Sequence, residues 1–271
     1  MTEANYMLGH SEEEIRRLMI QAAVLRPITE RLLRSTGIGW GMRVLDLGCG
    51  VGDVSMLAAE LVGPSGSVVG IDRSPEVLTV AERRARSAGF PQISFVEAAA
   101  DSFSGPEPFD LVIGRYVLIR QPDPGTFIRA AASHVRPKGI LAFHEVDLAT
   151  EARSLPQVPL WDRVGEWILT ALQAGLPHYD AANRMLEHFH QADLPAPTLF
   201  SEIPVGGGDE SPLYAWMVET LRSVLPQLVR SKIATPATIG IEAMEERLRA
   251  AVTQEQSQVA FFVQVCGWTR L

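Results

Sequence analysis

Residues 44–53 read VLDLGCGVGD, and this stretch decides the fold. Its apolar start is typical of a buried strand, and three glycines at alternating positions follow: Gly48, Gly50 and Gly52. Glycines let the backbone turn sharply and come close to a ligand, and the helix expected next directs its free N–H groups to the same place. The stretch therefore predicts a strand–loop–helix unit that holds a nucleotide-like ligand.

Short apolar or β-branched runs alternate with helical segments around this loop. Strands are expected at 43–47, 67–71, 93–97, 111–114 and 140–146, and helices between them at 54–61, 75–88 and 127–135. This alternation predicts an α/β fold, with a doubly wound, Rossmann-like and mostly parallel sheet and right-handed crossovers.

The remaining segments are expected to be mainly helical. Residues 1–35 are expected to form an N-terminal helical lid of two helices, the first of which ends near Pro27. The second domain, 36–271, carries cap helices at about 155–195 and 206–256. Apolar runs at 198–205 and 257–267 predict a last antiparallel pair of strands, which brings the sheet to seven strands.

Composition narrows the classes of partner. Because 24 Lys and Arg stand against 32 Asp and Glu, the net charge of −8 disfavours nucleic acid as a substrate. No run approaches the roughly 18 to 20 apolar residues that cross a bilayer, and residues 1–10 lack targeting character, so we expect no membrane partner and a cytoplasmic location. The two cysteines, Cys49 and Cys266, lack metal-ligand spacing, so no metal site is expected.

The residues beside the glycines bear on which nucleotide binds. A dinucleotide fingerprint has a third glycine at the position that Asp53 holds, where a carboxylate would face a pyrophosphate with like charge. Asp46, at the end of the strand, suits a cationic ligand group. S-adenosylmethionine carries an ammonium and no phosphate, so this loop favours it over NAD or FAD.

Several motifs in this order resemble those of the class I S-adenosylmethionine-dependent methyltransferase family. They are DLGCGVG at 46–52, GIDRSPE at 70–76, FDLV at 109–112, QPDP at 121–124 and RPKG at 136–139. The similarity covers roughly residues 36 to 150, and YMLGHS at 6–11 is similar to the opening of a bacterial small-molecule branch. The resemblance implies that 36–271 is a methyltransferase domain that uses S-adenosyl-L-methionine.

The resemblance also implies roles at the adenosine end of the donor. Asp72 would accept hydrogen bonds from both ribose hydroxyls, although a helix N-cap is the alternative role, and Arg73 would cover the adenine edge. The family's adenine-binding acid falls here on Ala99, which is a departure from the pattern. Either Asp101 takes over that contact or the backbone amide near Ala100 acts alone.

At the other end of the donor, Arg115 follows the fourth strand and reaches the crevice where open α/β sheets bind ligands. Its guanidinium could pair with the carboxylate of the methionine moiety, or form a surface salt bridge instead. Tyr6 could close over the same end of the donor from the N-terminal segment.

The chemistry expected is in-line methyl transfer to an oxygen, nitrogen or carbon atom of a small metabolite or natural product. A base is optional because the donor is already activated, so orientation supplies much of the acceleration. His144 and Glu145 are the candidate catalytic residues, with Asp147 and His178 as further candidates. The alternatives are a non-catalytic donor-binding regulatory or scaffold protein and a nicotinamide-dependent oxidoreductase. A monomer or a homodimer is expected.

Overall fold

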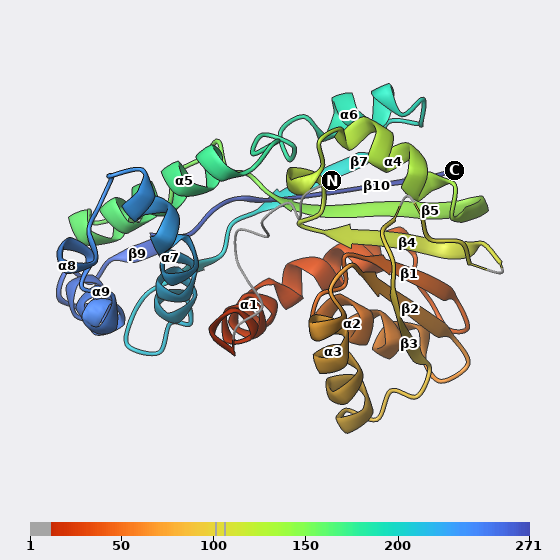
Figure 1. Cartoon of the computed structure of the whole chain (residues 1–271), viewed down its shortest axis with the longest axis horizontal. Helices are drawn as coiled ribbons and strands as arrows, with labels where there is room; N and C mark the ends of the chain where they lie inside the picture. Colours follow the sequence, from red (N-terminus) through yellow and green to blue (C-terminus); the bar gives the residue numbers. More distant parts are fainter. Residues whose placement is uncertain (1–11, 101, 106) are drawn as a thin grey trace. The chain divides into compact units, whose positions relative to one another are not determined.

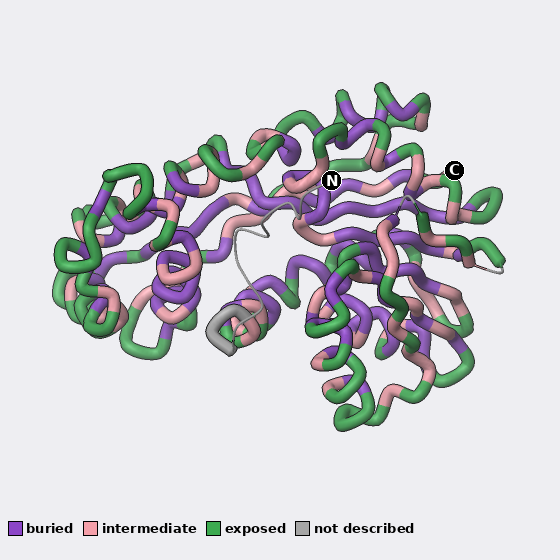
Figure 2. Tube along the Cα trace, in the orientation of Figure 1, coloured by how far each residue is buried: buried purple, intermediate pink, exposed green. Residues whose placement is uncertain are grey.

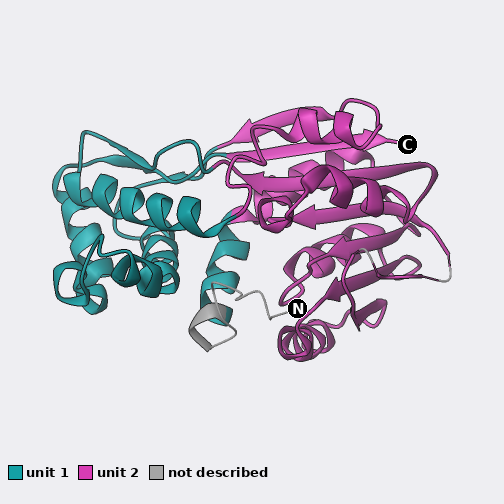
Figure 3. Ribbon diagram, turned by 45° about the horizontal axis from the view of Figure 1, so that its top comes forward, with its two compact units in different colours: residues 1–24, 148–176, 203–263 teal, residues 25–147, 177–202, 264–271 magenta. Residues whose placement is uncertain are grey.

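The computed structural model describes residues 12–100, 102–105 and 107–271, which divide into two compact units (Figure 3). The first unit comprises the described residues up to 24 together with 148–176 and 203–263. The second comprises 25–147, 177–202 and 264–271. The second unit contains the whole glycine loop. It also contains residues 177–195, which the sequence analysis assigned to the cap.

The second unit is built on a seven-stranded sheet (Figure 1). Its strands, in spatial order, are β3 (Ile93–Glu97), β2 (Ser67–Asp72), β1 (Arg43–Leu47), β4 (Phe109–Arg115), β5 (Val135–Val146), β10 (Gln264–Arg270) and β7 (Thr198–Glu202). The first five are parallel, and β10 is antiparallel to both β5 and β7. The predicted mostly parallel, seven-stranded sheet is confirmed.

The order of the strands fixes where the ligand crevice lies. From β1 the chain moves outward through α2 (Asp53–Val62), β2, α3 (Pro75–Ser87) and β3, whereas from β4 it moves the other way through α4 (Pro124–Ala132) to β5. Right-handed crossovers in opposite directions put α2 and α3 on one face and α4 on the other. The direction reverses between β1 and β4, so the crevice opens at the carboxyl ends of these two strands.

The centre of the sheet is the core of this unit, and its strands are buried along most of their length (Figure 2). Val44, Leu45 and Leu47 of β1 are fully buried, as are Leu111 and Val112 of β4. β3 lies at the edge of the sheet and is partly exposed. The glycine loop therefore follows a buried, closely packed central strand.

The expected break in the N-terminal helices at Pro27 is wrong. α1 runs continuously over Glu12–Thr36 with Pro27 inside it. Proline removes one backbone hydrogen bond and costs about 3 kcal/mol in a helix interior. Leu25, Ile28 and Leu32 are buried on one face across this point, and the Thr29 hydroxyl donates to the carbonyl of Leu25 at 3.1 Å. Burial of this apolar face offsets the cost of the proline.

The first unit contains helices and a small antiparallel sheet. Its helices include α5 (Pro159–Gly175), α7 (Leu213–Arg230), α8 (Pro236–Ile239) and α9 (Met244–Gln254), and its strands pair in the order β6 (Arg153–Leu155), β9 (Gln258–Ala260) and β8 (Val205–Gly206). Trp161 and Tyr214 meet edge to face in its core with ring centroids 6.3 Å apart. None of the helices in the described part of the chain is long and apolar enough to cross a lipid bilayer.

Each of the two expected C-terminal strands is divided between the units. The run 198–205 splits into β7 and β8, and the run 257–267 splits into β9 and β10. Pro204, which has no N–H to donate to a ladder, lies between β7 and β8, where the first run is interrupted. In the second run Phe261 and Phe262 lie between β9 and β10 with buried rings, and the Phe261 ring packs 4.4 Å from that of Trp216.

Candidate functional site

The glycine loop adopts the backbone conformation that its sequence predicts. Gly48, Gly50 and Gly52 have φ angles of +64°, +53° and +83°, which favour glycine. A Cβ built on Gly48 would lie 2.9 Å from Cγ1 of Val117, whereas one built on Gly50 would meet no atom within 4 Å. At Gly48 a side chain would clash with Val117, so the packing of the protein itself requires glycine there. Gly50 instead borders open space that a ligand can fill.

Asp72, at the end of β2, is tied directly to this loop. Its Oδ2 accepts the backbone N–H of Gly50 at 3.0 Å, and its Oδ1 accepts the N–H of Ser74 at 3.1 Å. Ser74 itself is the N-cap of α3, so the alternative role of Asp72 as that cap does not apply. Each carboxylate oxygen keeps a lone pair for a ligand hydroxyl. The arrangement places a two-oxygen acceptor beside the open side of Gly50.

Asp46, at the end of β1, is buried with 1% of its surface exposed. Its Oδ2 accepts the hydroxyl hydrogen of Ser55, on α2, at 2.6 Å. Burial raises the pKa of Asp46 to about 7, although the Ser55 hydrogen bond and the positive charge of Arg115 oppose this rise. Asp46 therefore fixes the start of α2 beneath the loop.

The sequence predicted that the Asp53 carboxylate would repel a pyrophosphate, but in the structure this carboxylate is paired with a cation. The carboxylate forms an ion pair with Arg84 of α3 at 2.7 Å, and the same guanidinium donates to the carbonyl of Val51. Because this ion pair compensates the negative charge, repulsion of a pyrophosphate by Asp53 is weaker than the sequence suggested. Arg84 is a residue that sequence reasoning missed, and it ties the loop to α3.

The adenosine end of the proposed site is described in part. Arg73 is exposed, and Ala100 is buried with its carbonyl 3.0 Å from Nε2 of His134. The edge of the His134 ring also lies against Phe103, with centroids 5.5 Å apart. Asp101 and Tyr6 lie outside the described residues. His134 was not expected from the sequence, and it supports the loop after β3.

Arg115 ends β4, next to the carboxyl end of β1, and is half-buried. Its Nη1 donates to the hydroxyl of Thr29 at 3.4 Å. Within the described residues it forms no ion pair with a carboxylate, so the surface salt bridge considered for it is not found there. A half-buried guanidinium with spare N–H donors at the crevice can bind a ligand carboxylate.

A chain of buried polar side chains continues from Arg115 across the sheet. Nδ1 of His144 lies 3.0 Å from the Thr29 hydroxyl, and its Nε2 lies 3.1 Å from Oε1 of Gln264. The Tyr116 hydroxyl donates to the same oxygen at 2.6 Å. Burial, aided by the positive charge of Arg115, lowers the pKa of His144 to about 3, so the imidazole is neutral at physiological pH. Gln264 is a single polar residue within an apolar run, and this is the feature of the sequence that could have indicated the buried hydrogen-bonded side chains.

Glu145, the other candidate catalytic residue, follows His144 on β5 and is also fully buried. Its Oε1 accepts the backbone N–H groups of both Val117 and Leu118 at 2.8 Å. Burial raises its pKa to about 8, against the opposing effect of these hydrogen bonds. Glu145 thus contacts the backbone that follows β4.

The two further candidates make hydrogen bonds within the sheet unit. Asp147 is buried, and its Oδ1 accepts from the amide of Asn183 at 2.7 Å. Nε2 of His178 lies 3.0 Å from the carbonyl of Pro122. Neither contact joins these residues to the glycine loop.

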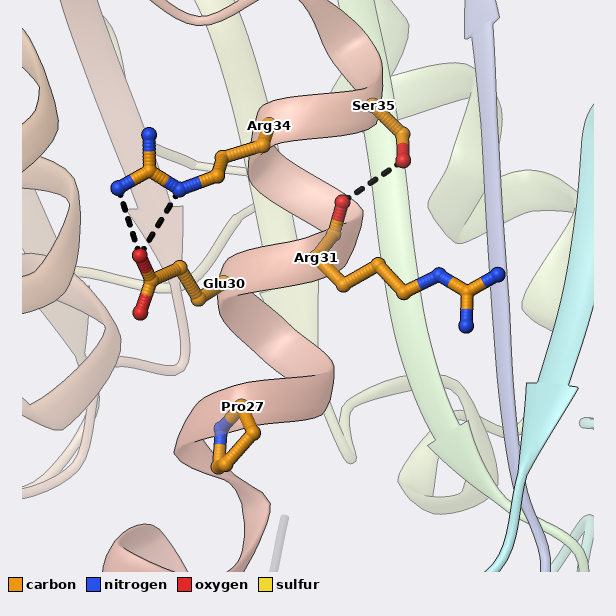
Figure 4. A pocket seen from close by; sticks show the side chains of 5 residues that line it. All are labelled: Pro27, Glu30, Arg31, Arg34 and Ser35. Atoms are coloured by element: carbon orange, nitrogen blue, oxygen red, sulfur yellow. Dashed lines mark hydrogen bonds and ion pairs between the residues drawn. The ribbon is translucent and has the colours of Figure 1, made fainter.

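A shallow hollow of about 530 Å³ lies beside α1 (Figure 4). It is lined by Pro27, Glu30, Arg31, Arg34 and Ser35. Arg34 pairs with Glu30 at 2.7 Å, and Arg31 pairs with Glu202 at the same distance. Because all of its lining comes from one helix and both cations are paired, this hollow does not match the donor, and the site is assigned to the glycine loop.

The chemistry of Gly50, Asp72 and Arg115 fits S-adenosylmethionine. The open side of Gly50 and the paired acceptors of Asp72 suit an adenosine ribose, and Arg115 suits the amino-acid carboxylate. In the described residues, these groups meet at the carboxyl ends of β2, β1 and β4, where the topology places the crevice.

Comparisons with known proteins show the family of this chain. Residues 38–187 match the family described as "Methyltransferase domain". The chain is 31% identical to a ubiquinone biosynthesis O-methyltransferase of Paracidovorax citrulli, over 57% of this chain and 65% of that protein. It is 36% identical to the aklanonic acid methyltransferase DauC of a Streptomyces species, over 43% of this chain and 54% of that protein.

A solved structure of a proposed methyltransferase from Bacillus halodurans shares the fold. It is 16% identical, with a TM-score of 0.59 over 89% of this chain and 97% of that chain. The match to the curated relatives named above spans about half to two thirds of their length. Since the family match covers more than half of the chain, this protein belongs to the class I S-adenosylmethionine-dependent methyltransferase family.

Proposed function

We propose that this chain transfers the methyl group of S-adenosylmethionine to an oxygen, nitrogen or carbon atom of a small metabolite or natural product. The observation that carries the proposal is the open side of Gly50 beside the two oxygens of Asp72. The relatives named above act on small molecules according to their names, which supports this class of acceptor.

The bound donor would supply a sulfonium methyl group that is already activated for displacement. The residues of this chain would then bind and orient. Asp72 would accept from the ribose hydroxyls, and Arg115 would hold the amino-acid carboxylate by a charge-assisted bond. Gly50 would allow the close approach of the loop to the donor, Gly48 and Gly52 would let the loop turn where Val117 and Phe95 pack on it, and Asp46 would fix the helix beneath it. This arrangement would act through proximity and orientation.

The buried candidates His144 and Glu145 would support the site rather than take a proton from the acceptor. His144 is fully buried between Thr29 and Gln264, with a pKa lowered to about 3 by burial, and such a group is a poor base at neutral pH. We therefore expect the pH profile of transfer to follow the ionisation of the acceptor.

A two-stage experiment tests the proposal. Calorimetry with S-adenosylhomocysteine should show binding, and binding of NAD alone would favour the oxidoreductase alternative. Incubation with methyl-labelled donor and a metabolite extract should then label a small molecule. Donor binding with no label transferred from extracts of several sources would favour the non-catalytic, regulatory alternative.

A further inference from the structure

The backbone turn that follows β4 contains a non-glycine residue with a positive φ angle. Tyr116 has a φ of +58°, which is uncommon for a bulky residue and which persists only where surrounding contacts impose it. Its N–H donates to the carbonyl of His144 at 2.9 Å, and the next two N–H groups, of Val117 and Leu118, converge on Oε1 of Glu145. Contacts from β5 thus impose the conformation of this turn.

The side chain of Val117 packs between the turn and the glycine loop, so the position of the turn affects the loop. Its Cγ1 lies 2.9 Å from the place of a Cβ on Gly48, and its Cγ2 lies 2.5 Å from the place of a Cβ on Gly114. Only the absence of side chains at these two glycines lets the isopropyl group sit there. The side chain of Val117 is therefore wedged between β4 and the first glycine of the loop.

Arg115 immediately precedes the turn, so its direction depends on the same backbone. Its positive charge acts on Asp46, below the loop, and on His144. A release of the turn would both withdraw Val117 from Gly48 and free the backbone that aims Arg115 at the crevice.

The carboxyl group of Glu145 is suited to hold a backbone and not to touch a ligand. Glu145 is 0% exposed, and its Oε2 is a buried oxygen with no hydrogen-bond partner among the described residues. A buried oxygen without a hydrogen-bond partner costs free energy of folding, and the other contacts of the same group must offset that cost. Those other contacts are with backbone N–H groups of residues 117–119, of which Val117 and Leu118 donate to Oε1 at 2.8 Å.

On the basis of the proposed function, we propose that Glu145 is a positioning residue that locks the turn 116–118, so that Val117 supports Gly48 and Arg115 reaches the amino-acid end of the donor. The adenosine end, held by Asp72 and Gly50, does not depend on this lock. Loss of the lock should consequently weaken binding of ligands that carry the amino-acid group and spare ligands that lack it.

Calorimetry with two ligands tests this inference on the full chain. S-adenosylhomocysteine has the amino-acid group, and 5′-methylthioadenosine keeps the adenosine but lacks that group. We expect Glu145→Ala to weaken S-adenosylhomocysteine binding about 10- to 100-fold and to change 5′-methylthioadenosine binding less than threefold. Glu145→Gln retains an oxygen for the two N–H groups and should stay within threefold of the wild type for both ligands.

A double-mutant cycle with Arg115→Gln separates positioning from general damage. Since Glu145 acts through the turn that carries Arg115, the double variant should bind S-adenosylhomocysteine little worse than Arg115→Gln alone. If Glu145→Ala does not fold, Glu145→Met keeps most of the side-chain volume but offers no oxygen to the two N–H groups, and it should produce the same selective loss.

Three results would overturn the inference: equal losses for both ligands, no loss for either, or additive effects in the cycle. A wild-type protein that binds neither compound would instead overturn the proposed function, and the inference with it. The two failures are therefore distinguishable.

Discussion

Replacement of Gly50 by alanine separates the ligand-binding role of the loop from its structural role. Gly50 has a φ of +53° and no atom within 4 Å of the place of a Cβ. The added methyl group meets no protein atom, so the only cost to the folded protein is the left-handed backbone, about 1 to 2 kcal/mol. For a chain of this size that cost lowers the melting temperature by roughly 2 to 8 °C.

The cost to donor binding should be larger than a change in stability explains. The methyl group enters the space that we assign to the donor, and overfilling a packed space costs about 1 to 3 kcal/mol. This corresponds to a loss of roughly 5- to 150-fold in affinity. Calorimetric titration of the folded variant and of the wild type with S-adenosylhomocysteine measures this loss.

Gly89 provides a matched control. It has a φ of +78° and also has no atom within 4 Å of the place of a Cβ, but it follows α3 at the opposite end of the crossover from the crevice. Gly89→Ala should lower the melting temperature by a similar amount and leave donor affinity unchanged. If Gly50→Ala and Gly89→Ala bind S-adenosylhomocysteine equally well, the donor does not lie against Gly50 and the assigned site is wrong.

Three other predictions concern carboxyl groups. Asp72→Ala should weaken S-adenosylhomocysteine binding at least tenfold in calorimetry, because it removes the acceptors beside Gly50. Asp123→Ala removes the N-cap of α4, whose oxygen accepts the N–H of Thr126 at 3.1 Å, and should lower the midpoint of urea unfolding with unchanged donor affinity. Between pH 6.5 and 8 the buried Glu145, with a pKa raised from 4.5 to about 8, keeps a proton that the unfolded chain has lost, so stability falls as pH rises by up to about 1.4 kcal/mol per pH unit. Glu145→Gln should flatten this slope in thermal unfolding, and a parallel slope would show that another group causes it.

The part of the fold around the glycine loop could be predicted because its signals are local. The alternation of apolar strands with amphipathic helices gave the bounds of β1 and β3 as observed, and the positive φ angles of the loop follow from its glycines. The order of the motifs also identified Asp72 at the end of β2, next to Gly50.

The rest depends on contacts between residues far apart in the sequence. Nothing near Pro27 shows that burial of Leu25 and Leu32 will carry α1 through it, and nothing near Glu145 shows that its oxygen will meet the N–H groups of a turn 27 and 28 positions earlier. Arg84 likewise compensates Asp53 from 31 positions away. Local pattern identifies elements, whereas the partner of a buried charge is set by the tertiary fold.

Three buried ionisable groups near the carboxyl ends of β1 and β5 share one electrostatic property. Burial raises the pKa values of Asp46 and Glu145 and lowers that of His144, so each of the three is shifted toward its neutral form. Among the residues assigned to the donor, Asp72 and Arg115 then supply the opposite charges that face the crevice. At neutral pH His144 is then uncharged and Glu145 mostly protonated, whereas Asp46, with a pKa of about 7, is only partly ionised. Asp72 and Arg115 would therefore orient the donor, and the buried groups would add little stabilisation of its positive sulfonium, which would otherwise oppose loss of the methyl group.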